Sequence, residues 1–233
     1  MSTTLDLQKP ATMEFRNARR VQEALTASAE RRVLLWLARR TPEGVSPDHL
    51  TALGFAAQIC AGAAYALARW DKYVLLLVVV FIALNWLGDS LDGTLARHRD
   101  KLRPRYGFYV DHMVDTFGAT ALIAGLVVSN YMSWQIAVAM LVAFLVLSVE
   151  TYLAAYTLHE FRLSHGPFGP TEIRLLLICG TIVLLFRPYA HLFGRAFLLF
   201  DGGGVIATIG MTGMAVIATI RHTIQLYREE RFS

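Results

Sequence analysis

Two pairs of aspartates stand beside some of the most apolar sequence in the chain, and this placement limits what the chain can fold into. The run Tyr73–Gly88 carries no charge and leads into the first pair, and the uncharged run Thr116–Ser129 follows the second. Apolar runs of this kind predict helices that cross a lipid bilayer. Carboxylates in such helices are costly, and those that occur usually bind ions or take part in chemistry. The pairs are Asp89 with Asp92 and Asp111 with Asp115.

The spacing within each pair places both carboxylates on one face of a helix. At about 100° per residue, Asp89 and Asp92 lie within about 60° of each other, and Asp111 and Asp115 are one turn apart. The two faces can meet, but four ionised carboxylates in contact would repel one another and lose their charge unless cations were present. Two divalent ions would balance the four negative charges.

The type of ligand predicts the type of ion. Aspartates without histidine or cysteine favour an oxygen-loving cation, Mg²⁺ or Mn²⁺, over zinc. Two such ions about 3.5–4 Å apart polarise a phosphate and stabilise the leaving oxygen in phosphoryl transfer. We therefore expect a site for two Mg²⁺ or Mn²⁺ ions between the two helices, with Asp89, Asp92, Asp111 and Asp115 as the metal ligands.

These residues resemble the signature of the CDP-alcohol phosphotransferases (the CDP-alcohol phosphatidyltransferase family), integral membrane enzymes of phospholipid biosynthesis. The signature is D-x-x-D-G-x-x-A-R, then eight or nine residues, then G-x-x-x-D-x-x-x-D. The chain carries every fixed position, from Asp89 to Arg97 and from Gly107 to Asp115. The resemblance implies an enzyme that transfers a phosphoalcohol unit from a CDP-alcohol to an acceptor alcohol and releases CMP. It also implies that Asp115, besides binding metal, is the catalytic base.

The same resemblance implies a binding site for cytidine diphosphate. Gly93, Ala96 and Gly107 are small residues past which the nucleotide can approach the backbone, although small residues also occur at ordinary contacts between membrane helices. Arg97 is expected to bind a phosphate, and its alternative role is to anchor its helix at the membrane interface.

A second part of the nucleotide site is expected at the start of the first membrane helix. Pro47–Thr51 resembles the P-N-x-x-T segment that borders the nucleotide pocket of the family, with Asp48 where the family has Asn. Asp48 and Thr51 are therefore candidates for binding CDP. The alternative is purely local, with Ser46 capping the helix and Pro47 in its first turn.

The candidates for the acceptor side are Glu150, Glu172 and Arg174. Thr171-Glu172-x-Arg174 resembles the T-E-x-Q segment of choline and ethanolamine phosphotransferases, with Arg in place of Gln. The alternative is that Thr171 caps a helix and Glu172 complements its dipole. Arg174 begins an apolar run and needs an anionic partner, which is Glu150, an aspartate of the cluster or a substrate phosphate. We expect an unphosphorylated acceptor or an amino-alcohol headgroup, and phosphatidyl transfer to glycerol phosphate or inositol phosphate stays open.

Composition and periodicity predict an all-α integral membrane protein with six transmembrane helices. Hydrophobic residues make up 55% of the 233 residues, more than in ordinary soluble domains. An amphipathic juxtamembrane helix is expected within Glu14–Arg40, so that residues 1–45 form an interfacial segment and residues 46–233 the membrane domain. Cys60 and Cys179 are expected to be small core residues. The predicted spans are Leu50–Ala68, Tyr73–Ala96, Phe108–Asn130, Trp134–Leu158, Thr171–Phe186 (the shortest) and Gly204–Gln225.

The distribution of basic residues predicts the topology. Arginines and lysines are concentrated before the first span, after the second and at the C-terminus, which places these segments on the cytoplasmic side. The aspartates are then expected near the cytoplasmic face of the cell membrane, where a soluble nucleotide would arrive. The net charge of +4 is explained by attraction to anionic membrane lipids, so no nucleic-acid partner is expected. No cleavable signal peptide is expected, because the first forty residues lack an apolar core.

Two other classes of function compete with a transferase. A cation transporter or channel also places carboxylates within the membrane, but it has no need of Gly93, Ala96, Arg97 and Gly107 at these offsets. A catalytically silent scaffold would be expected to lose at least one aspartate, and the chain retains all four. The expected partners are a CDP-alcohol, an acceptor alcohol and membrane lipids, and a homodimer stays open.

Overall fold

The computed structural model describes residues 19–21, 27–158, 160–162, 169–192 and 194–231. Most of these residues are helical, and the strands are short. The predicted all-α membrane fold is confirmed. The helices are α1 (Ala27–Arg40), α2 (Pro47–Leu67), α3 (Leu75–His98), α4 (Pro104–Ser129), α5 (Trp134–Thr157), α6 (Pro170–Phe186) and α7 (Leu199–Glu229), with a 3-10 turn, η1 (Lys72–Val74). The strands are β1 (Arg19–Val21), β2 (Glu160–Arg162), β3 (Tyr189–Leu192) and β4 (Arg195–Leu198).

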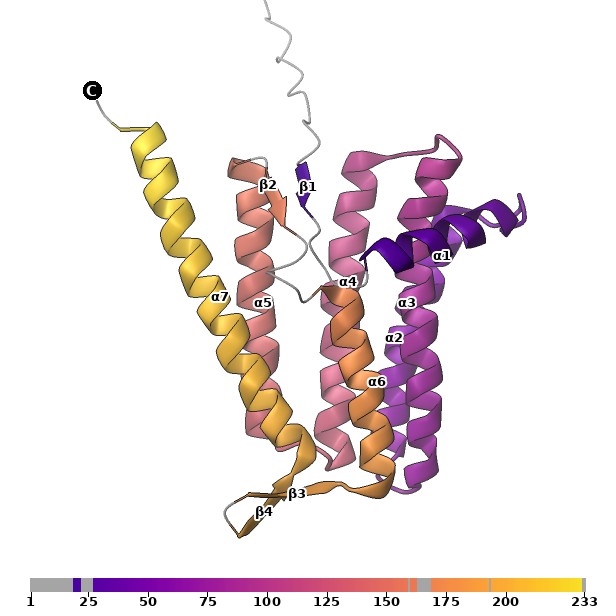
Figure 1. Cartoon of the computed structure of the whole chain (residues 1–233), viewed down its shortest axis with the longest axis vertical. Helices are drawn as coiled ribbons and strands as arrows, with labels where there is room; N and C mark the ends of the chain where they lie inside the picture. The colour runs from indigo at the N-terminus through magenta and orange to yellow at the C-terminus, as the bar shows by residue number, and fades with distance from the viewer. Residues whose placement is uncertain (1–18, 22–26, 159, 163–168, 193, 232–233) are drawn as a thin grey trace, which may run out of the picture.

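The long helices run up and down one bundle, and α1 lies across it (Figure 1). One end of the bundle carries α1, the C-terminal end of α7 and the parallel pair β1–β2. The opposite end carries the antiparallel β3–β4 hairpin. Helix α1 and the C-terminal end of α7 therefore lie at the same end of the bundle.

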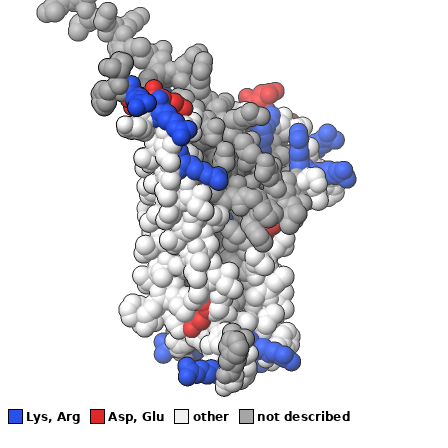
Figure 2. All heavy atoms as spheres, turned by 60° about the vertical axis from the view of Figure 1, so that its left-hand side comes forward, with Lys and Arg blue, Asp and Glu red and all other residues white. Residues whose placement is uncertain are grey.

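Five of the described helices, α2, α3 with η1, α4, α5 and α7, are long and apolar enough to cross a membrane. This makes the chain an integral, multi-pass membrane protein. The fifth predicted span corresponds to α6, which has 17 residues and a length of about 25 Å, short of a hydrocarbon core of about 30 Å. In Figure 1, α6 begins part-way along the bundle rather than at its end. On the left-hand part of the face shown in Figure 2, a broad band of uncharged residues lies between charged groups at the two ends.

Glycines allow α2 and α3 to approach closely next to the aspartates. A Cβ added to Gly88 would lie 2.5 Å from the backbone nitrogen of Gly54 and 2.6 Å from the carbonyl oxygen of Leu50. Contacts this short exclude any side chain, so the two backbones touch at this point. The contact immediately precedes Asp89 in α3 and brings the first turns of α2 alongside the signature.

Two polar contacts join the later helices to the bundle. The buried hydroxyls of Tyr65 in α2 and Thr181 in α6 share a hydrogen bond of 2.5 Å. At the other interface, Asp201 in the first turn of α7 accepts hydrogen bonds from the backbone nitrogen and hydroxyl of Ser133, which precedes α5. Hydrogen bonds between helices satisfy polar groups that lipid cannot.

Helix α1 buries one face and exposes another. Leu34 and Ala38 are buried against a small cluster that includes Leu91 and Leu95 of α3. Trp36 is exposed, with the guanidinium of Arg40 4.0 Å from its ring centroid. Val33 is also exposed, and Leu37 packs partly buried against the same cluster. Of the segment Glu14–Arg40 in which the amphipathic helix was expected, residues 14–18 and 22–26 lie outside the described part of the chain.

The two cysteines are on the outside of the bundle. Cys60 in α2 and Cys179 in α6 are both exposed and free. The prediction that they are core residues is wrong, because an apolar helix in lipid can place small apolar residues on its outer face as readily as on its inner one.

Candidate active site

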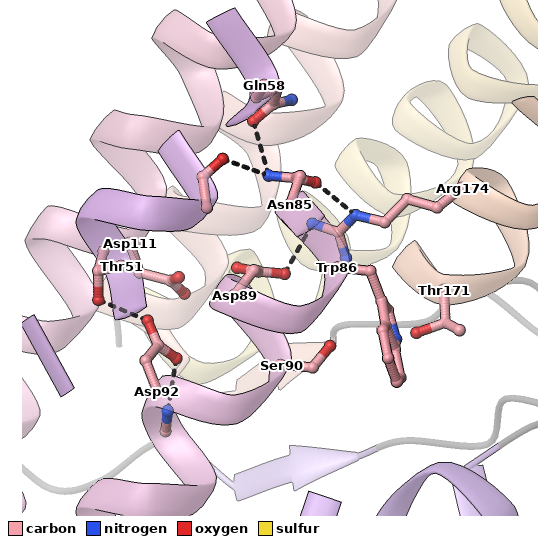
Figure 3. Close-up of polar contacts among 12 residues, drawn as sticks. Thr51, Gln58, Asn85, Trp86, Asp89, Ser90, Asp92, Asp111, Thr171 and Arg174 are labelled. Carbon is pink, nitrogen blue, oxygen red and sulfur yellow. Dashed lines mark hydrogen bonds and ion pairs between the residues drawn. The ribbon is translucent and has the colours of Figure 1, made fainter. Parts of the chain in front are cut away.

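Three of the four signature aspartates come together between α3 and α4. Oxygens of Asp89, Asp111 and Asp115 all lie within 4.8 Å of one another. Asp92, one turn further along α3, instead accepts a 2.5 Å hydrogen bond from the hydroxyl of Thr51 in α2 and another from the backbone of Gly93. Figure 3 shows Asp92 and Thr51 on the side of Asp89 that faces Asp111. The structure therefore forms a cluster of three aspartates with the fourth held beside it.

The donor atoms of this cluster suit a hard divalent cation. All three residues offer carboxylate oxygens, and each is partly buried. Asp111 keeps 42% of its side chain exposed and Asp89 keeps 22%, so an ion can reach them from outside the bundle. Oxygen-only donors of this kind fit Mg²⁺ or Mn²⁺ better than zinc.

Arg174 of α6 reaches across to the cluster. Its Nη2 donates to Asp89 Oδ2 at 2.7 Å and its Nε donates to Asn85 Oδ1 at 2.8 Å (Figure 3). The Arg174 side chain is only 13% exposed. Of the three anionic partners expected for Arg174, the structure selects an aspartate of the cluster.

Two amides complete this network, and sequence reasoning missed both. Asn85 Nδ2 donates to the Gly54 carbonyl at 3.0 Å and to Gln58 Oε1 at 3.3 Å. Asn85 is a polar residue in an otherwise apolar run, one helical turn before Asp89, and this isolated polarity was the available signal. The network borders a small cavity between α2, α3 and α4. Its lining residues are Thr51, Gly54, Phe55, Gln58, Asn85, Asp89, Val114 and Asp115.

Of the residues predicted to bind CDP, Gly93, Ala96 and Arg97 follow Asp92 along α3, and Gly107 lies in α4. An added Cβ on Gly93 would lie 3.5 Å from Arg97 Nη1, so the guanidinium lies against the glycine. Arg97 Nη2 also donates to Thr94 Oγ1 at 3.2 Å. Ala96 is buried in α3, and Gly107 in α4 has open space where a side chain would be.

The start of α2 shows the local arrangement that sequence reasoning kept as an alternative. Ser46 Oγ accepts a hydrogen bond of 3.2 Å from the backbone nitrogen of His49, and Pro47 is the first helical residue. Asp48 forms an ion pair with Arg103, and the hydrogen bond that Arg103 donates to this carboxylate raises the pKa of Arg103. Ser46 therefore caps the helix, while Thr51, one turn on, faces Asp92.

The acceptor candidates take separate positions. Glu172 is buried at the start of α6, where its Oε2 accepts a 2.9 Å hydrogen bond from the backbone nitrogen of Gly169. Gly169 is the N-terminal cap, so the alternative that Thr171 caps α6 is wrong. Glu150 of α5 lies 2.5 Å from Nδ1 of His222 in α7, a contact that sequence reasoning did not foresee.

Thr171 has a different partner, which was also missed. Its hydroxyl donates to Oε1 of Glu30 in α1 at 2.8 Å. Thr171 and Glu30 are 141 residues apart, so local sequence patterns carried no signal for this contact.

Comparisons with known proteins agree with this geometry. A model of the CDP-alcohol phosphatidyltransferase family matches residues 45–221. Among solved structures, the chain is similar to Mycobacterium tuberculosis phosphatidylinositol phosphate synthase with CDP-DAG bound. The two are 19% identical with a TM-score of 0.57, and the match covers 84% of this chain and 94% of the other. A search of the curated proteins gives no match.

At this identity the structural likeness shows a shared fold, and the family match shows ancestry over most of the chain. The matched range 45–221 spans α2 to α7 and contains all four aspartates of the signature. The chain therefore belongs to the CDP-alcohol phosphatidyltransferase family of membrane-embedded transferases.

Proposed function

We propose that the protein transfers a phosphoalcohol unit from a CDP-alcohol to the hydroxyl of an acceptor alcohol, with release of CMP, in phospholipid biosynthesis. The observation that carries the proposal is the convergence of Asp89, Asp111 and Asp115 within 4.8 Å, inside a signature matched at every fixed position. A transporter or a silent scaffold requires no such match to a transferase signature.

Asp89, Asp111 and Asp115 would hold a divalent cation, Mg²⁺ or Mn²⁺, and Asp92 would help to hold a second. When bound, such ions neutralise the pyrophosphate and stabilise the leaving phosphate of CMP. Arg174 supplies a fixed positive charge beside Asp89 and keeps that carboxylate in place. The oxygen-only donor set supports this assignment.

Asp115 is proposed to be the base, following the family signature. The acceptor hydroxyl gives its proton to the Asp115 carboxylate while its oxygen bonds to the phosphorus that carries the alcohol. The bond from that phosphorus to the bridging oxygen breaks, and the bridging oxygen leaves on CMP. Asp115 lines the small cavity together with Thr51 and Asn85, which leaves space beside the proposed base.

The nucleotide is proposed to lie along the cytoplasmic part of α2, α3 and α4. Gly93, Ala96 and Gly107 would let the cytidine diphosphate approach the helices, and Arg97, next to Gly93, would donate to a phosphate. Thr51 would orient Asp92, to which it is already bonded. Asp48 would lie at the edge of this site, as its exposed ion pair with Arg103 indicates.

For the acceptor we favour an unphosphorylated alcohol or an amino-alcohol headgroup. A phosphorylated acceptor brings a dianion that needs several cationic donors. Arg174 is already paired with Asp89, and the other two candidates, Glu150 and Glu172, are carboxylates. Arg174→Ala tests this preference: a raised apparent KM for phosphate-bearing acceptors alone would contradict it and make Arg174 the anchor of that phosphate.

The active site is proposed to open to the cytoplasm. The end of the bundle that carries α1 and the C-terminal end of α7 is also the end at which α3 meets α4 through the basic segment Arg99–Arg105. Basic residues favour the cytoplasmic side of a membrane, which would be the cell membrane.

CMP release tests the reaction. The purified protein with Mg²⁺ is offered CDP-diacylglycerol with serine, glycerol, inositol, glycerol phosphate or inositol phosphate, and CDP-ethanolamine with diacylglycerol. We expect CMP in at least one pair, and its loss in Asp111→Asn. Asp71→Asn is the matched control, because Asp71 caps η1 at the opposite end of the bundle and asparagine caps equally well. Absence of CMP from every pair would contradict the proposal.

A further inference from the structure

A carboxylate of the crossing helix α1 reaches the junction between α3 and α6. Oε1 of Glu30 accepts hydrogen bonds from Thr171 Oγ1 at 2.8 Å, Trp86 Nε1 at 3.0 Å and Ser90 Oγ at 3.1 Å. Figure 3 shows the three donor side chains gathered on one side of α3. Three donors from two other helices thus converge on one oxygen, which is more than a glutamate needs to complement the dipole of its own helix.

The donors are close neighbours of the active-site residues in the chain. Ser90 follows Asp89, and Thr171 lies three residues before Arg174, on the same side of the first turn of α6. Arg174 itself bonds to Asp89 and Asn85. The first turn of α6 is therefore held to α3 at two points, directly by Arg174 and through α1 by Glu30.

The position of α6 makes this contact important. The helix begins part-way along the bundle, so its first turn lies at the depth of the aspartates rather than at the end of the bundle (Figures 1 and 3). Hydrogen bonds to a charged acceptor are stronger than those between neutral groups, especially away from water. Without Glu30, the first turn of α6 would keep the hydrogen bonds of Arg174 to α3 but lose the contact that Thr171 makes through α1.

We propose that Glu30 is a positioning residue, which acts through Thr171 to hold the first turn of α6 and Arg174 against the aspartates. This role rests on the proposed function, because it assigns the first turn of α6 to the acceptor side. The nucleotide side is built from α2, α4 and the part of α3 from Asp92 onward, whereas the donors that bond to Glu30 are Trp86 and Ser90, which precede Asp92 in α3, and Thr171 of α6. Removing Glu30 should therefore affect the acceptor more than the CDP-alcohol.

A structural measurement tests the connection without any substrate. Hydrogen exchange of the full-length protein in detergent is followed at the amides of residues 171–174. Glu30→Ala and Thr171→Val should both speed exchange there by about tenfold, the effect of one lost hydrogen bond to a charged group. Trp86→Phe is the matched control, because it removes a donor that joins Glu30 to α3 and leaves the α6 contact intact. Unchanged exchange in Glu30→Ala would overturn the proposal.

Kinetics test the consequence. With a donor and acceptor pair that gives CMP in the assay above, Glu30→Ala should raise the apparent KM of the acceptor about tenfold and change that of the CDP-alcohol less than about twofold. Glu30→Gln keeps an accepting oxygen and should stay within about threefold of the wild type. The double variant Glu30→Ala with Thr171→Val should be no worse than Glu30→Ala alone, since both break the same contact.

The outcomes separate the two proposals. Equal rises in both KM values, or a Trp86→Phe variant as impaired as Glu30→Ala, would overturn the positioning role. A wild-type protein that releases no CMP from any pair would contradict the proposed function, while the exchange measurement would still decide whether Glu30 holds α6.

Discussion

Replacing Arg174 with alanine removes the guanidinium that lies 2.7 Å from Asp89, next to Asp111 and Asp115. Without it, three carboxylates share one partly buried site with no cation from α6 to offset them. Removing one partner of a buried ion pair costs about 3–5 kcal/mol, and the partial exposure of Asp89 reduces this to about 2–3 kcal/mol. A bound divalent cation would replace most of the lost positive charge.

We therefore expect the loss of stability in Arg174→Ala to depend on divalent cations. In a chelator, the apparent Tm of the detergent-solubilised variant should fall by about 5–10 °C relative to the wild type. Saturating Mg²⁺ should raise the Tm of the variant more than that of the wild type, because binding to the folded state alone stabilises it. The assay is a thermal unfolding series over Mg²⁺ concentration.

Arg103→Ala is the matched control for this series. Its partner Asp48 is at the surface, and the side chains of Asp48 and Arg103 are 47% and 52% exposed, so water and salt screen the pair and it contributes little to stability. Its Tm should respond to Mg²⁺ as the wild type does. An Arg174→Ala variant with the same response as this control would refute the reasoning, since it would mean that Arg174 and the cation do not share the carboxylates.

Further predictions concern the base, the topology and the packing. Asp115→Asn should still bind the CDP-alcohol in an equilibrium binding assay but should no longer catalyse transfer. Asp89→Asn should lose transferase activity and the response of that activity to divalent ions. Equal loss of CDP-alcohol binding in the two variants would make Asp115 primarily a metal ligand. Cysteines placed at the two termini of a cysteine-free protein should both be shielded from an impermeant thiol reagent in sealed right-side-out cells, and labelling of one terminus alone would show that α6 does not cross. Gly88→Ala should destabilise the protein by about 1–3 kcal/mol in a chemical unfolding assay, because the new Cβ meets the backbone of Gly54, and an unchanged midpoint would contradict that packing.

The membrane bundle and the place of the aspartates were predictable because they depend on local patterns. Apolar runs define membrane helices by length and composition, and the period of the helix puts Asp111 and Asp115 on one face. The family followed from the same residues, because the signature is itself two helical spacings joined by a fixed loop length. The three-member cluster, with Asp92 turned towards Thr51, depends on how closely α2 approaches α3 at Gly54.

The partners of individual side chains were not predictable, because they depend on how separate helices pack. Arg174 had three anionic candidates, and the choice of Asp89 follows from the depth at which α6 begins. Glu30 bonds to residues 56, 60 and 141 positions away, a separation that no periodicity encodes. The cap of α6 was misplaced for a local reason, since Glu172 reaches back to Gly169, which makes Gly169, two residues before Thr171, the N-terminal cap.

The central claim is that the aspartate cluster catalyses transfer from a CDP-alcohol, and CMP release measures it most directly. The wild-type protein in CDP-diacylglycerol micelles with Mg²⁺ and the acceptor panel should release CMP in stoichiometric amounts with the new phospholipid. Release should stop on chelation, return on adding Mg²⁺ or Mn²⁺, and be absent in Asp111→Asn but normal in Asp71→Asn. CMP release by Asp111→Asn at the wild-type rate would contradict the account.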